Sequence, residues 1–342
     1  MGWLAEPDHR ERRADPTRIL PDAASVICVA LCYPPGRNGE RDRRLGRIAR
    51  YAVGEDYHRV MRDLLVALER FVTEEALPGA RALAYADTGA ILERAWAEKA
   101  GLGWTGKHSG LLSQEIGSYF LLGELLVDRA LDSDTPLARE HCGTCTRCIT
   151  ACPTGAIVAP YQVDARLCIS YLTIELRGAI PRELRPLVSD WIFGCDLCQE
   201  ACPWNRFAPP AREARLHARA LDGWTLERFL TLDTAAFEML FAQSPIRRAG
   251  RDGFLRNVCV ALGNRGEIAA APALIRALER DPDALVRAHA AWALGELRRK
   301  HRGAPDRAAV LEAIRAALER AADADADVSV REEANESSRS SS

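Results

Sequence analysis

Eight of the eleven cysteines in this 342-residue chain lie between Cys142 and Cys202, and their spacing restricts what this stretch can fold into. The first run reads CGTCTRCITACP: three cysteines with two residues between neighbours, then a fourth after three residues, directly followed by proline. Three thiolates on one tight loop can surround a four-iron cubane, whereas the fourth points away toward a second cluster. A partner run is therefore expected.

The second run begins at Cys195 and reads CDLCQEACPW, again with three residues before its last cysteine, Cys202, and a proline behind it. The two runs supply seven thiolates, but two four-iron clusters need eight. Cys168, in DARLCISYLTIEL, is the only other cysteine between the runs, and we take it as the eighth ligand. For Cys168 alone, a buried core thiol is a plausible alternative.

The two-cluster pattern of bacterial ferredoxins assigns each thiolate, because the fourth cysteine of one run ligates the cluster of the other. The predicted ligands of cluster one are Cys142, Cys145, Cys148 and Cys202. The predicted ligands of cluster two are Cys152, Cys168, Cys195 and Cys198. Zinc is the alternative for C-x-x-C pairs, but zinc sites rarely combine a third cysteine at this spacing with a C-P ending. Cys28, Cys32 and Cys259 lie in apolar segments and are predicted to be core residues.

The composition indicates a globular protein, since 48% of the residues are apolar and the formal net charge is −2. No apolar run reaches the roughly 18 residues that a membrane span requires. Residues 1–16 are charged and polar and do not form a secretion signal. We therefore expect a cytoplasmic protein with no membrane contact. In that reducing compartment, clustered cysteines hold metal more often than they form disulfides.

Strand-like and helix-like stretches alternate over the first part of the chain. The predicted elements are strands near residues 26–31 and 81–85, helices near 58–77 and 90–100, and then the apolar run SYFLLGELLVD. This alternation predicts an α/β domain over residues 1–133. A polar connector then leads into the ferredoxin-like two-cluster domain, predicted at residues 134–210.

The rest of the chain is predicted to be helical and repetitive. RNVCVALGNRG, from Arg256, recurs as RAHAAWALGELR, from Arg287, which predicts stacked HEAT-like repeats over residues 211–322, packed on the cluster domain. The acidic and serine-rich residues 323–342 are predicted to be disordered. Residues 245–307 contain 13 Arg or Lys against 7 Asp or Glu. Nucleic acid is therefore one candidate partner, although solvated helix surfaces explain such an excess equally well.

In the first domain, Asp87 is a candidate for acid-base chemistry, because it follows an apolar strand and precedes a helix. A buried carboxyl there could have a raised pKa and donate a proton near neutral pH. The residues alone favour a plainer interpretation, in which Asp87 is the N-cap of the helix that follows.

A glycine-spaced loop, GLGWTGKHSG, contains Lys107, His108 and Ser109, and its backbone could approach a large ligand closely or simply form a turn. No G-x-G-x-x-G follows a strand and no P-loop is present, so nicotinamide and nucleoside triphosphate sites are not indicated. DYHRVM, from Asp56, resembles the D-x-H-x-x-G signature of some cobalamin proteins. We discount this match because Met61 replaces the glycine.

Several of these segments together resemble the epoxyqueuosine reductase family. The resemblance spans nearly the whole chain and rests on ADTGAILERAWAEKAGLGWTGKH, ARYAVGEDYHRVMRDLL, CGTCTRCITACPTGAI, LCISYLTIE and GCDLCQEACPWN. Members of this family use cobalamin and two [4Fe-4S] clusters, and they are related to the reductive dehalogenases. They reduce an epoxide on the modified base at the tRNA wobble position to an alkene.

The resemblance implies that the α/β domain binds cobalamin, with one cluster close to the cobalt. It implies that Asp87 lies beside the cofactor and protonates the oxygen that the opened epoxide leaves behind. Further implied cobalamin contacts are Lys107, His108, Ser109 and Ser113.

The implied substrate is a tRNA anticodon stem-loop that carries epoxyqueuosine. The basic helical region should then hold the phosphate backbone, with Arg247, Arg248, Arg251 and Arg256 as candidate contacts. We also expect a low-potential electron donor as partner and a monomeric protein.

The chain opens at MGWLAEPDHRERRADP, which in the family follows an N-terminal segment of several dozen residues. We expect either a misassigned start or the absence of the first helices. Two other functions are compatible with the clusters: an electron-transfer protein without cobalamin, and a corrinoid reductive dehalogenase acting on small organohalides. The Asp87 segment argues against the first of these. The HEAT-like repeats and the lack of a twin-arginine export signal argue against the second.

Overall fold

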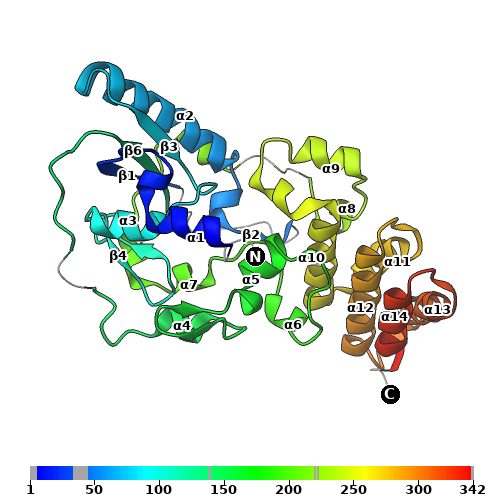
Figure 1. Cartoon of the computed structure of the whole chain (residues 1–342). Coiled ribbons are helices and arrows are strands. Elements are labelled where there is room, and N and C mark those ends of the chain that lie inside the picture. The colour runs from blue at the N-terminus through cyan, green and yellow to red at the C-terminus, as the bar shows by residue number, and fades with distance from the viewer. Residues whose placement is uncertain (1–5, 34–44, 138–139, 219–220, 222, 340–342) are drawn as a thin grey trace.

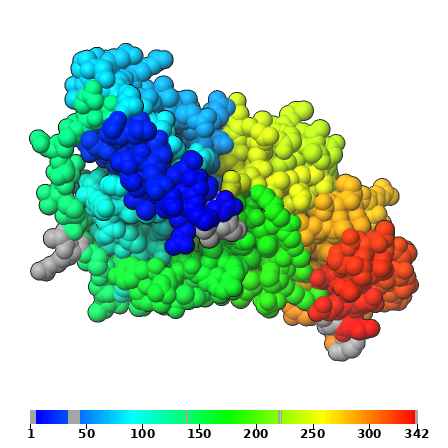
Figure 2. Space-filling model, viewed as in Figure 1, coloured from blue at the N-terminus to red at the C-terminus, as the bar shows by residue number. Residues whose placement is uncertain are grey.

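The computed structural model of the chain describes residues 6–33, 45–137, 140–218, 221 and 223–339. A small sheet and its helices occupy one end of the molecule, the cysteine-rich segment runs below them, and a stack of helices forms the opposite end (Figure 1). In the space-filling view the cysteine-rich segment, in green, borders both the N-terminal part and the C-terminal helices (Figure 2). No helix in these ranges is long and apolar enough to cross a membrane.

The sheet contains β1 (Ser25–Cys32), β6 (Phe120–Val127) and β3 (Ala82–Tyr85). Strands were predicted near residues 26–31 and 81–85, and β6 lies in the apolar run SYFLLGELLVD. β6 is the middle strand and is antiparallel to both neighbours. β1 and β3 therefore run in the same direction without pairing to each other. The order of elements predicted an α/β domain, but these three strands form no parallel pair, because β6 enters between the two earlier strands.

Helices cover both faces of this sheet. On one face α2 (Tyr57–Arg70) lies so close to β6 that a Cβ on Gly123 would come 3.0 Å from the sulfur of Met61. On the other face, β6 residue Leu126 packs with Trp96 of α3 (Glu93–Lys99). Alternate residues of a strand face opposite sides, so Glu124 shares the α3 side with Leu126. A short helix, α1 (Pro7–Ala14), precedes the sheet.

The cysteine-rich segment consists of short elements joined by tight turns. They are α4 (Arg147–Ala151), β7 (Ile157–Ala159), β8 (Gln162–Val163), α5 (Ile169–Ile174), α6 (Arg185–Val188), β9 (Trp191–Phe193) and α7 (Leu197–Glu200). The two helices that follow the first cysteines of each run, α4 and α7, pack against each other. β9 pairs in parallel with β2 (Arg47–Ile48), which joins this segment to the N-terminal part.

The C-terminal part is helical, as predicted. Its helices are α8 (Leu226–Phe229), α9 (Thr234–Leu240), α10 (Gly250–Arg265), α11 (Ala271–Arg280), α12 (Ala284–Lys300), α13 (Ala308–Ala324) and α14 (Val328–Arg339). Gly263 allows α10 and α12 to approach, since a Cβ there would meet the Trp292 ring at 2.8 Å. α10 also packs on α5, α6 and β9, so one apolar core extends from the cysteine-rich segment into this stack.

The prediction of disorder from residue 323 is wrong for the described part of this segment. α14 packs against α12 and α13, and its buried residues Val330, Ala334 and Ser337 recur at helical spacing. Glu333 forms ion pairs with Arg182 and Arg185. Acidic composition suggested a solvated tail, but these acids lie on the outer face of an amphipathic helix or pair with arginines of an earlier segment.

The three cysteines predicted to be core residues differ in burial. Cys259 is fully buried in α10, where the alanine-rich sequence predicted it. Cys28 and Cys32 are only half-buried along β1. Burial, aided by the nearby charge of Glu124, raises the pKa of the Cys28 thiol to about 12.

Candidate functional site

A cavity of about 1110 Å³ lies among the N-terminal part, the cysteine-rich segment and the first C-terminal turns. Most of its lining comes from five stretches of the chain: residues 56–58 at the start of α2, 87–98 from the loop after β3 into α3, 105–109, 174–175 and 242–248. Arg13, Tyr51, Tyr161 and Phe193 complete it. Drug-sized ligands occupy cavities of about 300 to 1,000 Å³. This one is therefore large enough for a ligand at or above the top of that range.

Asp87 lies in the wall of this cavity, in the loop that follows β3. Its φ is +57°, in the left-handed region that is uncommon for residues other than glycine. Its backbone N–H donates to Glu93 Oε1 at 2.5 Å. α3 begins at Glu93 with Leu92 as its N-cap, six residues after Asp87. The N-cap interpretation of Asp87 is therefore wrong, and its side chain lines the cavity instead.

Two side chains from the start of α2 donate to the same carboxyl oxygen of Asp87. The Tyr57 hydroxyl lies 2.6 Å from Asp87 Oδ2, and His58 Nε2 lies 3.1 Å from it. The other ring nitrogen of His58, Nδ1, lies 2.7 Å from Asp56 Oδ1. The rings of Tyr57 and His58 stack with their centroids 4.0 Å apart. Asp56, His58 and Asp87 thus form a continuous hydrogen-bonded chain that ends in the cavity.

This chain determines which group carries the proton. Hydrogen bonds from His58 and Tyr57 lower the pKa of Asp87, although burial opposes them. Burial lowers the pKa of His58, but its hydrogen bonds to Asp56 and Asp87 outweigh that effect and raise it to about 9. The expectation of a raised pKa at Asp87 is therefore wrong in direction. Near neutral pH, His58 is an imidazolium and Asp87 is a carboxylate.

The residues expected to contact cobalamin take different positions. Ser109 lines the cavity, with φ at +63°. Lys107 lies behind it, and its ammonium donates to the carbonyl oxygens of Gly143 at 2.5 Å and Cys145 at 3.0 Å. Lys107 thereby ties the glycine-spaced loop to the first cysteine run.

His108 and Ser113 are both buried and do not line the cavity. His108 Nδ1 accepts the N–H of Gly110 at 3.0 Å, whereas its Nε2 has no hydrogen-bond partner in the described chain. Burial lowers the pKa of His108, so its ring is neutral. Ser113 pairs through its backbone with Gly117 and accepts the N–H of Glu115, which makes it part of a turn.

The eight cysteines, seven from the two runs and Cys168, form two predicted groups that lie near each other. Burial raises the pKa of Cys202, and the nearby thiols of the first group add to this effect; they are Cys142, Cys148 and Cys145. Burial likewise raises the pKa of Cys198 to about 12, with contributions from Cys168, Cys148 and Cys152. Cys195 has Cys198 and Cys168 as its cysteine neighbours. Cys148, predicted for cluster one, also acts on Cys198, so these influences do not separate the two ligand sets and the crossed pairing stays a prediction.

The separation of the thiols also bears on the kind of metal site. Within the described ranges, no three His, Cys, Asp or Glu side chains converge closely enough to bind a single metal ion. Each thiolate of a four-iron cluster binds a different iron, so its ligands stand farther apart than those of one zinc ion. The eight thiols of this segment equal the number of ligands that two cubanes require.

Two of the four arginines predicted to contact nucleic acid are unavailable for that role. Arg256 is fully buried, and its guanidinium donates to the backbone carbonyls of Leu172, Leu176 and Gly178. These bonds fix the turn after α5 onto α10. A buried guanidinium with all its donors directed inward cannot reach a phosphate, so this expectation is wrong.

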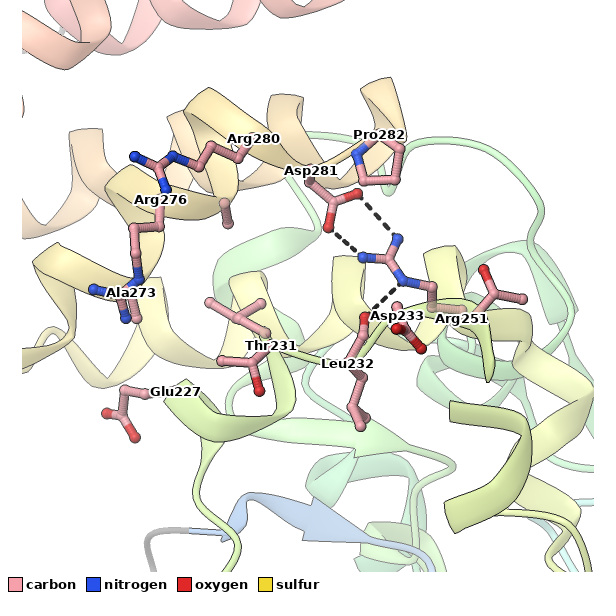
Figure 3. A pocket seen from close by; sticks show the side chains of 13 residues that line it. Glu227, Thr231, Leu232, Asp233, Arg251, Ala273, Arg276, Arg280, Asp281 and Pro282 are labelled. Carbon is pink, nitrogen blue, oxygen red and sulfur yellow. Dashed lines mark hydrogen bonds and ion pairs between the residues drawn. The ribbon is translucent and has the colours of Figure 1, made fainter. Parts of the chain in front are cut away.

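Arg251 is also committed within the protein. It donates to both carboxyl oxygens of Asp281 and to the carbonyl of Leu232, beside a small pocket of about 310 Å³ (Figure 3). Arg247 and Arg248 differ from it, since both line the large cavity and their side chains are 52% and 55% exposed. They pair with Glu238 and Glu175 at the cavity edge.

Sequence reasoning missed three acid-base groups, two in the cavity wall and one, Glu124, buried in the sheet behind it. His58 was set aside with its motif, although an Asp-x-His at a helix start can place an imidazole against the capping carboxylate. Glu93 and Glu124 were not considered. A lone glutamate in the apolar run FLLGELLV was a signal that a charge is buried there.

Comparisons with known proteins agree across sequence and structure. Residues 141–205 match the family model for a 4Fe-4S double cluster binding domain, and residues 13–88 match the model described as epoxyqueuosine reductase QueG, DUF1730. The chain is 44% identical over 305 residues to the epoxyqueuosine reductase of Xanthomonas campestris, covering 86% of this chain and 84% of that protein. It is also 44% identical to that of Escherichia coli over 314 residues, covering 86% and 78% of the two chains.

Solved structures give the same result. An epoxyqueuosine reductase in complex with an epoxyqueuosine-modified tRNA-Tyr stem loop superposes with a TM-score of 0.88 at 31% identity, over 98% of this chain and 86% of that one. A Bacillus subtilis epoxyqueuosine reductase, in a structure with its catalytic aspartate loop swung out of the active site, gives a TM-score of 0.86 at 31% identity, with the same coverages.

Proposed function

This chain belongs to the epoxyqueuosine reductase family, and we propose that the cavity beside Asp87 is where it reduces the epoxide of epoxyqueuosine in tRNA. The reaction consumes two electrons and two protons, and it releases one water as the epoxide becomes an alkene. The observation that supports this site most directly is the proton chain from Asp56 through His58 to Asp87, which ends at the cavity.

The eight cysteines fit two [4Fe-4S] clusters, which supply single electrons. We propose the crossed ligand sets. Cluster one is held by Cys142, Cys145, Cys148 and Cys202, and cluster two by Cys152, Cys168, Cys195 and Cys198. The contact between Lys107 and the loop of the first run supports a fixed position of cluster one relative to the cavity wall.

Cobalamin is the proposed third cofactor, and the size of the cavity supports this proposal. The volume of about 1110 Å³ lies against Asp87 and Ser109, and the buried, unpartnered Nε2 of His108 lies in the adjoining loop. We propose Ser109 as a direct contact, with Lys107, His108 and Ser113 shaping the loop behind it. Reduced cobalamin, when bound, supplies a strongly nucleophilic metal centre that can open an epoxide.

Residues of the cavity wall deliver protons to the substrate oxygen. As the C–O bond of the epoxide breaks, the His58 imidazolium gives its proton to Asp87 through the 3.1 Å contact, and Asp87 passes it on to the oxygen. A second proton converts the resulting hydroxyl into water, which leaves as the alkene forms. Burial and the neighbouring Asp87 charge raise the pKa of Tyr57 far above its usual range, so its hydroxyl stays protonated and orients the Asp87 carboxylate.

Arg247 and Arg248 are the proposed contacts for the phosphate backbone of the anticodon stem-loop. Both lie at the cavity edge, more than half exposed, where an extruded wobble base could enter. Their acidic partners, Glu238 and Glu175, can be exchanged for phosphate groups, since exposed ion pairs contribute little stability. A tRNA substrate is consistent with a cytoplasmic location and with a low-potential electron donor there.

The test is anaerobic turnover of epoxyqueuosine-containing tRNA. The chain is reconstituted with iron and sulfide, supplied with cobalamin and a low-potential reductant, and compared with Asp87→Asn and with the exposed control Glu74→Gln. We expect turnover by the wild type and the control, and a loss of about 100-fold or more in Asp87→Asn. Absence of wild-type turnover with both clusters and cobalamin bound would refute the proposal. Dehalogenation, or electron transfer to a partner protein without cobalamin, would then favour the two other functions considered.

A further inference from the structure

Glu124 is an acid buried in the middle strand of the sheet. Its side chain is fully inaccessible to solvent, between Gly123 and Leu125 in an apolar strand. No N–H or O–H group in the described chain donates to either of its carboxyl oxygens. Its hydrogen-bonding neighbour is another carboxyl, that of Glu93 on α3. Two carboxyl groups in such contact cannot both be ionised at low cost, so a proton must lie between them.

The second carboxyl of this pair reaches the active site. Glu93 Oε1 accepts the backbone N–H of Asp87 at 2.5 Å. Glu93 therefore contacts both the acid in the core of the sheet and the loop that carries Asp87. That loop needs support, because Asp87 has a left-handed backbone with φ at +57°, which is uncommon for residues other than glycine.

We propose that Glu124 and Glu93 are positioning residues: they share a proton as a buried acid pair, and this pair holds the Asp87 loop in the cavity wall. The proton on Glu124 fixes the Glu93 carboxyl, and the Glu93 carboxyl fixes the Asp87 N–H. Loss of the shared proton places two negative charges in contact, so Glu93 moves away and the loop is released. The role of this loop in catalysis rests on the proposed function; its attachment to the acid pair does not.

The surroundings of the pair favour the protonated form. Burial is the largest influence, followed by the charges of Glu93 and Asp87, and together they raise the pKa of Glu124 well above its usual range. Cys28 on β1 and Tyr85 on β3 flank Glu124 in the sheet, and neither carries a positive charge. Arg94 on α3 is the cation that acts on the pair, and its effect on Glu93 is smaller than that of burial.

One relative has a structure in which its catalytic loop is displaced. In the Bacillus subtilis structure the catalytic aspartate loop is swung out of the active site. In the present structure the Asp87 side chain instead meets Tyr57 and His58. If Glu93 and Glu124 stay in contact only while they share a proton, the inward position of the Asp87 loop depends on that proton.

The experiment compares three variants of the full chain without tRNA. Glu124→Gln keeps a neutral donor toward Glu93 and cannot ionise. Glu124→Leu removes the donor and keeps a side chain of similar volume. Glu74→Gln is the matched control, because Glu74 is an exposed acid of the same domain. Circular dichroism and thermal unfolding establish that each variant is folded.

Infrared spectroscopy is the first measurement, because a protonated carboxyl has a carbonyl band separate from that of a carboxylate. We expect the wild type and Glu74→Gln to show this band at neutral pH and to lose it at alkaline pH. Glu124→Gln should lack it at both. A wild-type spectrum without a protonated carboxyl at neutral pH would overturn the proposal.

Amide hydrogen exchange of Asp87 is the second measurement, corrected for the intrinsic dependence of exchange on pH. At neutral pH we expect exchange about three- to tenfold faster in Glu124→Leu than in the wild type. At alkaline pH the wild type should lose protection, whereas Glu124→Gln should keep it. Equal loss of protection in wild type and Glu124→Gln would refute the acid pair, and Glu124→Gln alone decides this if Glu124→Leu does not fold. Neither measurement requires turnover, so failure of the proposed reaction would be seen separately.

Discussion

Replacing Asp56 by asparagine is expected to lower the pKa of His58, because it removes one of the two charges that hold the imidazolium proton. Asp56 caps α2 by accepting the backbone N–H of His58 at 3.0 Å, and its same oxygen lies 2.7 Å from His58 Nδ1. Asparagine caps a helix about as well as aspartate. Asp56→Asn therefore removes the charge and leaves the start of the helix in place.

The size of the effect follows from the pKa of His58, which rises from an ordinary 6.5 to about 9. This difference corresponds to about 3 kcal/mol of preference for the protonated ring. Asp56 and Asp87 both contribute by hydrogen bond and by charge. Loss of the Asp56 charge should remove about half of the preference, roughly 1.5 kcal/mol, which is about a tenfold weaker affinity of His58 for its proton.

The same substitution changes how stability depends on pH. Because the folded-state pKa of His58 lies above its unfolded value, its stabilising contribution is complete below about pH 6.5 and is lost as the pH rises through about 9. The wild type should therefore lose unfolding free energy across this window. Asp56→Asn should lose about half as much, and at a lower pH.

The assay is an NMR titration of the His58 ring protons, assigned by their disappearance in His58→Gln. Asp233→Asn is the control, since Asp233 caps α9 in the same way, accepting the N–H of Ala236 at 2.7 Å. It should leave the titration of His58 unchanged. If His58 titrates at the same pH in Asp56→Asn and wild type, or near its ordinary value in wild type, the carboxylates do not hold its proton and the proposed proton route fails.

Three further predictions concern the clusters, the tRNA surface and the core. Cys152→Ala should remove about half of the reconstituted iron by damaging cluster two, with cluster one still visible by electron paramagnetic resonance, whereas Cys28→Ala should retain both clusters; loss of both in Cys152→Ala would contradict the crossed pairing. The double variant Arg247→Gln/Arg248→Gln should weaken tRNA binding. It should also make the slope of log binding constant against log salt concentration shallower by about 2, because two phosphate contacts are lost, and an unchanged slope would contradict this role. Arg256→Met should lower the free energy of unfolding by about 3 to 5 kcal/mol in denaturant titrations, because three buried carbonyl oxygens lose their hydrogen-bond donor. A loss below about 1 kcal/mol would show that these hydrogen bonds are not needed for stability.

Local sequence patterns predicted those elements whose formation depends mainly on residues close in the chain. The apolar stretches located β1 and β3, and the cysteine intervals indicated a double-cluster segment, which the family model over residues 141–205 confirms. Local patterns did not predict which strands pair. β6 enters the sheet between β1 and β3, and only contacts between distant segments decide that order.

The hydrogen-bonded chain at Asp87 likewise depends on contacts between residues far apart in the sequence. His58 and Asp87 are 29 residues apart, on different elements, and their contact depends on how α2 packs against the sheet. Without that contact, burial was the evident influence on Asp87, and it gave the wrong direction for its pKa. The structure reverses the direction because two donors converge on one carboxyl oxygen.

Arg256 and Glu124 illustrate how far a charge in an apolar run can be interpreted. Each is a single charged residue in a stretch that is otherwise suited to the core, and each is fully buried. The pattern therefore indicates burial in both cases, but the role depends on the partner. Arg256 meets carbonyl oxygens that accept all its donors, which makes it a fixed structural link. Glu124 meets a second acid, an arrangement that is stable only while one proton is shared. A buried charge whose partner can itself titrate can respond to pH, and in this chain that partner is bonded to the backbone of Asp87.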